Sequence, residues 1–415
     1  MRLLVICQNY WPEPFNVDDI CEGLVSAGHS VTVLTGLPNY PDGVVPEKYR
    51  HGGNREQRRN GVRVLRVPIV ARGADLRSFN KLRRVANYLS FALSGSLKAM
   101  RLDEEYDAVL VLQFSPILMS IPGLVVGRTQ NVPVLLYIFD LWPEDMMTGG
   151  IVRGSLPYRA MKAISKAIYG KADKIAVTSP DFEKYLHEDL GLLGVRAIWL
   201  PQYAESQFEE LSEASSADCR QGPLQFVFAG NVGVSQSVDV IVRAASLLVG
   251  RIDALVHIVG SGSQLNDCKA LAERLKVGNV VFHGRRPLDE MREFYQRADA
   301  MLLTLAESDG GSKVPLYTIP RKLQSYLASG KPIIVSAPGA ASRIVRDADC
   351  GLCCTPGSPE ELAGAMIRFA SLQPSEKQKM GRNARTHYAE RFSRAQFFKQ
   401  LNKELRVLKG TEHVA

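Results

Sequence analysis

The chain has 415 residues, of which 46% are hydrophobic and 23% charged, and its formal net charge is +8. This length is about two to three times that of a typical domain, so it predicts two domains that each bury a core. The composition is globular and excludes a fibrous repeat, wholesale disorder and a disulfide scaffold. Scattered cysteines, and a chain that opens on an apolar run without a basic leader, indicate a cytoplasmic protein.

The first half of the chain alternates short apolar runs with helix-length segments, which predicts a mostly parallel sheet. One apolar stretch, 108–126, approaches the length of a transmembrane helix. It contains Gln113, Pro116 and Pro122, so a buried strand followed by a helix explains it better than a membrane span. The expected strands are 1–8, 30–36, 62–67, 108–112, 134–139 and 174–178, with a helix over 18–27.

Positive charge is concentrated between Lys48 and Arg101, where 14 lysines and arginines stand against 2 acidic residues. Within this segment, apolar residues recur at helical spacing and predict one apolar helix face. The face fits either a core-packing helix with a basic end or a helix that docks on anionic lipid headgroups. Its apolar residues are Leu82, Val85, Leu89, Leu93, Leu97 and Met100, and the basic residues at its start are Arg77, Lys81, Arg83 and Arg84.

Nucleic acid is a weak alternative partner for this basic segment. The chain has no helix-turn-helix signature, no zinc finger and no basic stretch interleaved with aromatic residues. We therefore expect no nucleic acid among the partners.

The second half repeats the organisation of the first. A polar and acidic stretch, 204–222, is typical of a linker or a hinge-side helix, and beyond Gly381 the chain is helical and basic. We expect Rossmann-like domains over 1–200 and 201–385, and a helical segment over 386–415 that packs back across their junction. The apolar runs of the second half are 224–230, 255–260, 280–284, 300–305, 332–337 and 351–354.

Two common sites are poorly supported. A dinucleotide-binding dehydrogenase should carry G-x-G-x-x-G after a strand, yet the first strand runs into a segment without glycine, and Gly260-Ser261-Gly262 lacks the third glycine. Cys350 and Cys353 form a C-x-x-C pair, but no second pair or nearby histidine completes a zinc site. We expect no metal site.

The stretch 314–332 predicts an anion site. Pro320 fits the first turn of a helix that Thr318 can cap, and Arg321 and Lys322 add two cations in that turn. Cations at a helix N-terminus are unfavourable unless an anion is bound, and a diphosphate is the natural anion. The alternative is that both side chains point into water. The Gly310-Gly311-Ser312 loop, which allows close approach of a backbone to a ligand, favours the anion site.

Five ordered stretches carry a resemblance to a known family. The chain resembles family 4 glycosyltransferases of the GT-B fold, in particular the bacterial subgroup that makes O-antigen, capsule and colanic acid, of the L-fucosamine transferase type. The resemblance implies two Rossmann-like α/β domains facing across a cleft, with a C-terminal helix returning to the N-terminal domain. The stretches are NVDDICEGLVSAGHSVTVLTGLPNYPDG, NYLSFALS, FDLWPED, FAGNVGVSQSVDVIVRAA and TIPRKLQSYLASGKP.

The resemblance also implies an activity and partners. The N-terminal domain would bind the acceptor, a polyprenyl-diphosphate-linked saccharide, and the C-terminal domain a nucleotide-sugar donor. The donor would be UDP-linked and carry an N-acetylated amino or deoxyamino sugar, transferred with retention and without metal or cofactor. The enzyme would sit peripherally on the anionic inner face of the cytoplasmic membrane. The alternatives are a nucleotide-sugar 2-epimerase of the same architecture and a basic membrane or nucleic-acid adaptor.

This chain departs from the family pattern at Phe139, where many members have a histidine, and at four donor-binding positions. Two glutamates that bind the donor in many members fall on Leu316 and Gln324, and an arginine and a lysine that hold phosphate fall on Asn231 and Gln236. More of the anion binding is thereby left to the 318–322 segment. The candidate catalytic residues are Asp140, Glu144 and Lys322, and the candidate donor-binding residues are Asn16, Asp19, Asn231, Gln236, Gly284, Arg285, Arg321, Lys322 and Gln324.

Overall fold

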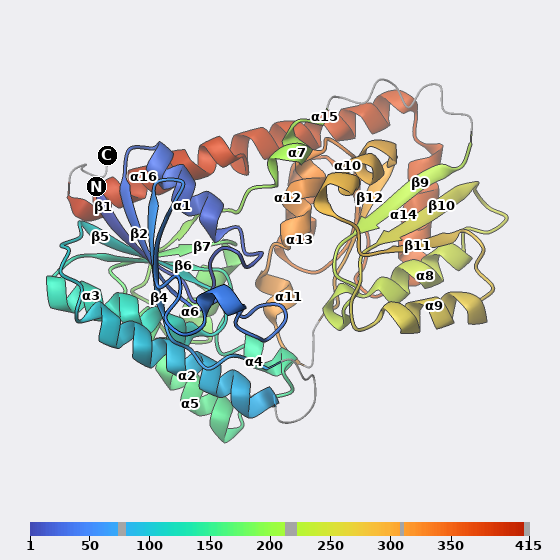
Figure 1. Cartoon of the computed structure of the whole chain (residues 1–415). Coiled ribbons are helices and arrows are strands. Elements are labelled where there is room, and N and C mark those ends of the chain that lie inside the picture. Colours follow the sequence, from blue (N-terminus) through green and yellow to red (C-terminus); the bar gives the residue numbers. More distant parts are fainter. Residues whose placement is uncertain (74–79, 212–221, 308–310, 411–415) are drawn as a thin grey trace. The chain divides into compact units, whose positions relative to one another are not determined.

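The computed structural model describes residues 1–73, 80–211, 222–307 and 311–410 (Figure 1). The chain divides into two compact units, the first formed by Met1–Leu200 with Phe398–Ala415 and the second by Pro201–Phe397. Each unit contains one sheet of mostly or wholly parallel strands flanked by helices, as the sequence predicts.

The first unit is built on an eight-stranded sheet in the order β3-β4-β2-β1-β5-β6-β7-β8. All neighbours pair in parallel except β3, which runs antiparallel to β4. The apolar runs predicted as strands are strands, whereas β3 and β8 were not predicted. The strands are β1 (Arg2–Ile6), β2 (Ser30–Gly36), β3 (Glu56–Arg59), β4 (Val62–Val67), β5 (Ala108–Gln113), β6 (Val134–Ile138), β7 (Lys174–Val177) and β8 (Ala197–Trp199).

Helices cover both faces of this sheet, with α1 and α16 on one face and α2, α3 and α5 on the other (Figure 1). Residues 108–126 form β5, η2 and the start of α3, and within the described residues no helix has the length and apolar character needed to cross a membrane. The helices are α1 (Val17–Ser26), η1 (Glu47–Tyr49), α2 (Asn80–Ala99), η2 (Ile117–Ser120), α3 (Ile121–Gln130), α4 (Asp145–Thr148), α5 (Leu156–Tyr169), α6 (Asp181–Glu188) and α16 (Arg394–Lys409).

The C-terminal helix α16 returns to the N-terminal unit, as predicted. The imidazole Nε2 of His29 lies 2.8 Å from Asn402 Oδ1, and Lys409 Nζ donates to Asp107 Oδ1 at 2.8 Å. A Cβ atom on Gly23 would overlap the Phe398 ring, so α1 and α16 pack in direct contact because Gly23 has no side chain.

The apolar face predicted on α2 points to solvent, which excludes the core-packing interpretation. The helix instead buries its opposite face, where Gly95 is small enough to lie against Pro122 of α3. Of the basic residues expected at the start, Arg77 and the side chain of Lys81 lie outside the described residues. The buried residues of α2 are Asn87, Phe91, Ala92, Gly95 and Ala99.

The second unit is built on a six-stranded parallel sheet in the order β11-β10-β9-β12-β13-β14. Of the predicted linker, residues 206–209 form α7 and 212–221 lie outside the described residues. The strands are β9 (Leu224–Ala229), β10 (Ala254–Val259), β11 (Val280–Gly284), β12 (Ala300–Thr304), β13 (Ile333–Ser336) and β14 (Gly351–Cys353).

An apolar core joins this sheet to its helices, with Phe226 and Val256 of the strands packed among residues of α8 and α14. Because all six strands are parallel, the loops that follow them meet at one edge of the sheet, where α/β proteins bind ligands. The helices are α7 (Ser206–Glu209), η4 (Val234–Gln236), α8 (Val238–Ser246), α9 (Leu265–Arg274), α10 (Leu288–Arg297), α11 (Val314–Tyr317), α12 (Arg321–Ala328), α13 (Ala340–Asp347), α14 (Pro359–Ser371) and α15 (Pro374–Arg391).

Candidate functional site

The loops after β9, β10 and β11 lie in contact at the carboxyl edge of the second sheet. The Gly260 N–H donates to the Gly284 carbonyl at 2.8 Å, and a Cβ atom on Gly260 would lie 1.8 Å from the Gly230 carbonyl oxygen. A Cβ atom on Gly262 would lie 2.3 Å from the Val232 carbonyl oxygen. Gly260 and Gly262, which form a poor dinucleotide-binding motif, are therefore needed here so that the loops after β9 and β10 can lie in contact.

Lys322 projects from the first turn of α12 towards these loops. Its ammonium group lies 4.2 Å from the centre of the Phe228 ring and donates to the Gln236 amide oxygen. Gly230 lies on the same loop after β9 as Gln236, and a Cβ atom on it would lie 3.5 Å from Lys322 Nζ. Among the described residues no carboxylate pairs with it, and burial lowers the pKa of Lys322 to about 7. A desolvated cation beside an aromatic face and a glycine loop, without a carboxylate partner, is stabilised when an anion binds next to it.

Arg321 has a different environment. Its Nη2 lies 2.9 Å from Glu205 Oε1, and Ser325 donates to the other oxygen of the same carboxylate at 3.1 Å. The side chain therefore does not simply point into water, as the alternative to the anion site supposed. Its charge is compensated within the second unit, so Lys322 is the cation better placed to meet a diphosphate.

The first turn of α12 lacks a side-chain cap. The helix begins at Arg321 with Pro320 as its N-cap residue, and among the described residues no side chain caps its N-terminal N–H groups. The expectation that Thr318 caps this helix is wrong, because Thr318 ends α11, two residues too early to reach the first turn. Free N–H groups at a helix N-terminus are a further attraction for an anion.

Gln324 is 1% exposed and turns back on this first turn. In the orientation that satisfies its amide, the nitrogen donates to the carbonyl oxygens of Pro320 at 3.0 Å and Arg321 at 2.8 Å. In this arrangement Gln324 orders the turn that carries Lys322.

Three other predicted donor-binding residues lie on the same loops. Asn231 is exposed, and its side-chain amide lies next to Gly233 and Gly262. Cβ atoms on these two glycines would lie 2.7 and 2.5 Å from the amide. Gly284 adopts a positive φ of 68° at the end of β11. Arg285 follows it with an exposed guanidinium, which has no hydrogen bond or ion pair within the part of the chain that the structure describes. The loop that continues into α11 is held at Ser312, which is 0% exposed and accepts from the Val314 N–H at 3.2 Å, whereas Gly310 lies outside the described residues.

In the first unit, Asp140 belongs to a cluster that the sequence did not reveal. Its Oδ2 accepts from the Ser115 N–H at 2.7 Å, while the Ser115 hydroxyl donates to Asp145 at 3.2 Å and accepts from the Trp142 indole at 3.0 Å. Burial raises the pKa of Asp140, although its bonds from Ser115 act in the opposite direction. Burial and the neighbouring Asp140 raise the pKa of Asp145 well above its ordinary value. Two carboxyl groups thus share one serine at the ends of β5 and β6.

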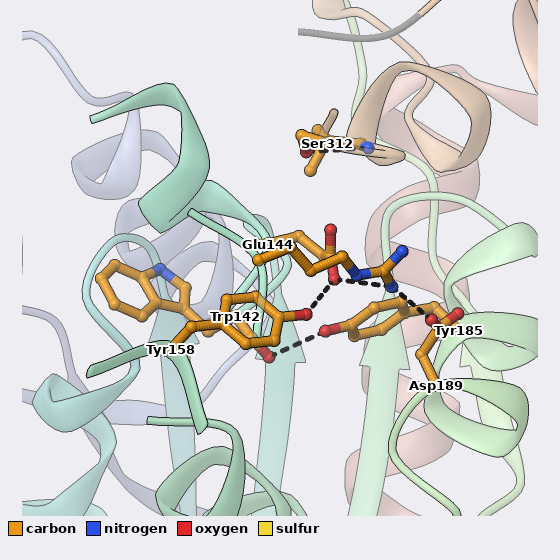
Figure 2. Close-up of polar contacts among 8 residues, drawn as sticks. Trp142, Glu144, Tyr158, Tyr185, Asp189 and Ser312 are labelled. Atoms are coloured by element: carbon orange, nitrogen blue, oxygen red, sulfur yellow. Dashed lines mark hydrogen bonds and ion pairs between the residues drawn. The ribbon is translucent and has the colours of Figure 1, made fainter. Parts of the chain in front are cut away.

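Glu144 lies in a second buried network. It is 0% exposed and occupies the N-cap position of α4, where its side chain makes no capping bond. Figure 2 shows the Tyr158 hydroxyl pointing at its carboxylate, with an O–O distance of 2.6 Å. Arg153 bridges Glu144 Oε1 at 3.3 Å and Asp189 Oδ1 at 2.6 Å, whereas Glu144 Oε2 is buried without a hydrogen bond within the described chain. These bonds hold Glu144 in one position after β6.

The loop after β1 contains the remaining candidates and a residue that the sequence did not single out. Asn16 is the N-cap residue of α1, with φ 48°, and Asp19 lies in the first turn of that helix. Glu13 is 5% exposed and accepts from the N–H groups of Asn39 at 2.9 Å and Tyr40 at 2.8 Å. Glu13 thereby joins the loop after β1 to the loop after β2. The only signal for it in the sequence is its position shortly after a predicted strand.

Two family models match the chain, one on each unit. The Glycosyl transferase 4-like domain matches residues 16–201, and the Glycosyl transferases group 1 domain matches residues 213–387. With two Rossmann-like units and these two domains, the protein is a glycosyltransferase of the GT-B fold.

Relatives in sequence bear similar names. WcaI of Escherichia coli (strain K12), named for colanic acid biosynthesis as a glycosyl transferase, is 24% identical over 94% of this chain and 96% of its own length. WbjE of Pseudomonas aeruginosa, named as a glycosyltransferase, is 26% identical over 58% of this chain. The match spans 60% of the length of WbjE.

Solved structures share the fold. Sucrose-phosphate synthase from Thermosynechococcus elongatus superposes with a TM-score of 0.71 at 18% identity, over 99% of this chain and 100% of its own. Anabaena HepE in complex with UDP gives a TM-score of 0.68 at 13% identity, over 98% of this chain and 100% of its own. At these identities the likeness concerns the fold.

Proposed function

We propose that the protein transfers a sugar from a UDP-linked donor to a lipid-linked saccharide, in the synthesis of a bacterial surface polysaccharide at the inner face of the cytoplasmic membrane. The observation that carries the proposal is Lys322, a cation without a carboxylate partner in the described chain, next to an uncapped helix N-terminus and glycine loops. The name of WcaI and the UDP in the HepE structure support the polysaccharide and the nucleotide.

Lys322 would act on the leaving group. As the bond from the anomeric carbon to the diphosphate breaks, negative charge grows on the phosphate oxygens, and a preorganised cation stabilises it. We propose that Lys322 and the first turn of α12 supply this charge, so that transfer needs no metal. Retention at the anomeric carbon is proposed from the resemblance to family 4 glycosyltransferases. Asn231, Gln236, Gly284 and Arg285 would contact the donor from the neighbouring loops, and Arg321 would hold the turn through Glu205.

For the first unit we propose a role in acceptor binding and catalysis. Asp140 and Glu144 follow β6, and each is held by hydrogen bonds that limit its movement. Asn16 and Asp19, at the start of α1, are proposed to contact the donor. The donor sugar is proposed to be an N-acetylated amino or deoxyamino sugar.

Lys322→Ala tests the proposal directly. Loss of a charge-assisted contact of about 1.5 to 3 kcal/mol should lower turnover roughly ten- to a hundredfold. The assay measures UDP release and product formation with a panel of UDP-amino sugars and polyprenyl-diphosphate saccharides, with and without EDTA. Lys269→Ala, which removes an exposed lysine of the same unit, is the matched control and should leave turnover unchanged.

Three results would contradict the proposal. Unchanged turnover in Lys322→Ala would move the diphosphate site elsewhere, and loss of activity in EDTA would refute metal independence. Formation of an epimer of the donor sugar without acceptor and without UDP release would identify a nucleotide-sugar 2-epimerase instead.

A further inference from the structure

The helix α2 carries an apolar face that the fold leaves uncovered. Six apolar side chains spaced by three or four residues are each at least 43% exposed, and Leu82 and Leu93 reach 74% and 65%. They extend along about 27 Å of helix, at ~1.5 Å per residue. Scattered exposed leucines are common, whereas a continuous row marks an interaction surface. The row consists of Leu82, Val85, Leu89, Leu93, Leu97 and Met100.

The row is not required by the core of the first unit. The opposite face of α2 is fully packed, with Phe91 and Asn87 each 0% exposed. The Asn87 amide donates to the Val70 carbonyl at 2.7 Å and accepts from Gln8 at 2.7 Å, so even the polar residue on this buried face is satisfied. The helix therefore has two complete faces, one for the core and one for a partner.

The charges within the row are all of one sign, and the acidic residues Asp103, Glu104 and Glu105 follow only beyond its C-terminal end. Residues 82–101 contain Arg83, Arg84, Lys98 and Arg101 and no acidic residue. The neighbouring α5 has the same character, since residues 156–169 include one arginine and two lysines, no acidic residue, and Leu156 at 80% exposure. Both helices pack against η2, and Figure 1 draws them on the same side of the first unit.

We propose that α2, assisted by α5, docks the protein on a lipid bilayer with anionic headgroups. The leucine row would enter the boundary between headgroups and acyl chains, and the flanking arginines and lysines would meet the lipid phosphates. A protein partner would need an apolar groove lined by acidic side chains, and a nucleic acid has no apolar surface to cover a row of leucines. A bilayer offers both an apolar interior and anionic headgroups along the whole helix. This inference rests on the proposed function, because docking would give the enzyme access to a lipid-linked acceptor.

Vesicle flotation tests the docking without any turnover. The full chain is mixed with phosphatidylcholine vesicles containing phosphatidylglycerol, or with phosphatidylcholine alone. We expect the wild type to float with the anionic vesicles. We expect Leu89→Gln with Leu93→Gln, and separately Arg83→Glu with Arg84→Glu, to lower the bound fraction at least roughly tenfold.

A matched control removes exposed apolar groups from the second unit. Val249→Gln with Leu275→Gln changes side chains that are 61% and 38% exposed, and this variant should float as the wild type does. Thermal unfolding and calorimetric UDP binding should be unchanged in the α2 variants, because their side chains are exposed and belong to neither candidate site.

The proposal is overturned if the wild type stays with the dense fraction, or if the α2 variants float as well as the wild type. A wild-type dimer that becomes monomeric in Leu89→Gln with Leu93→Gln, without flotation, would make the face an interface between copies. Flotation of a protein that neither binds UDP nor transfers sugar would refute the proposed function and leave the docking intact.

Discussion

Lys322 should make donor binding depend on pH near neutrality. Burial lowers the pKa of this lysine from its ordinary value to about 7, so the empty site holds a mixture of charged and neutral lysine at pH 7. A diphosphate binds the charged form. Apparent affinity is reduced by the fraction of protein in the competent form, which is about 90% at pH 6 and about 10% at pH 8. Affinity for a UDP-sugar should consequently fall about tenfold over this range.

The measurement is isothermal titration with UDP-N-acetylglucosamine at pH 6, 7 and 8. A nucleotide sugar is the better ligand because it has no terminal phosphate of pKa about 6, whose own titration would obscure that of the lysine. Lys322→Arg is the control, since a guanidinium stays charged across the range and should give a flat profile.

The direction of the change follows from linkage. Binding favours the protonated lysine, so the complex takes up a proton above pH 7 and affinity decreases as pH rises. Wild-type affinity that is constant within twofold between pH 6 and 8, or an equal slope in Lys322→Arg, would refute the assignment of the site to this lysine.

Three further changes test the packing around the sites. Lys322→Met should raise the unfolding temperature of the second unit most below pH 7, where the folded protein keeps a charged and desolvated lysine. Between about pH 7 and 10.5 the folded protein binds fewer protons than the unfolded chain, so wild-type stability rises with pH over this range. Thermal unfolding of wild type and mutant at pH 6 and 9 measures the difference. Gly260→Ala should weaken UDP binding at least tenfold, because its Cβ would lie 1.8 Å from a carbonyl oxygen of the adjacent loop, whereas Gly278→Ala, in open space, should bind normally by calorimetry. Tyr158→Phe should destabilise the first unit by about 1 to 3 kcal/mol in urea unfolding, because Glu144 loses its 2.6 Å hydrogen bond, and an unchanged midpoint would contradict that role.

The strands were predictable where both faces of the sheet are covered. All six residues of β5 are buried, so the strand appears in the sequence as a continuous apolar run. In contrast, β3 reads Glu-Gln-Arg-Arg and lies at the sheet edge, where Arg63 of β4 pairs with Glu56 at 2.7 Å. A strand whose side chains are polar and partly exposed leaves no apolar signal, and sequence patterning misses it.

The periodicity of α2 identified its apolar face but not the environment of that face. An amphipathic pattern has the same period whether the apolar side meets a core or a membrane. The deciding residues are on the other side of the helix, where Gly95 and Ala99 are too small to produce a strong hydrophobic signal and yet permit close packing on α3.

The candidate sites were predictable only in part, because many of their contacts join distant segments. Lys322 could be found from its place in a helical first turn. The partner of Arg321 is Glu205, far away in sequence, and the link from Asp140 through Ser115 to Asp145 depends on two strand ends meeting. No spacing rule along one chain encodes such a contact.

The contrast between Arg321 and Lys322 bears on how one lysine could bind the diphosphate of the proposed donor. Arg321 is paired with a carboxylate and adds little net charge to the site, whereas Lys322 is largely desolvated and has no counterion in the described chain. For the charged form of Lys322, this desolvation occurs on folding, before a donor binds, and it destabilises the empty second unit. In the proposed reaction, a diphosphate would lose only its own hydration, and its attraction to the ammonium group would grow as charge develops on the leaving oxygens. An unpaired lysine thus favours the transition state more than an equally placed ion pair would.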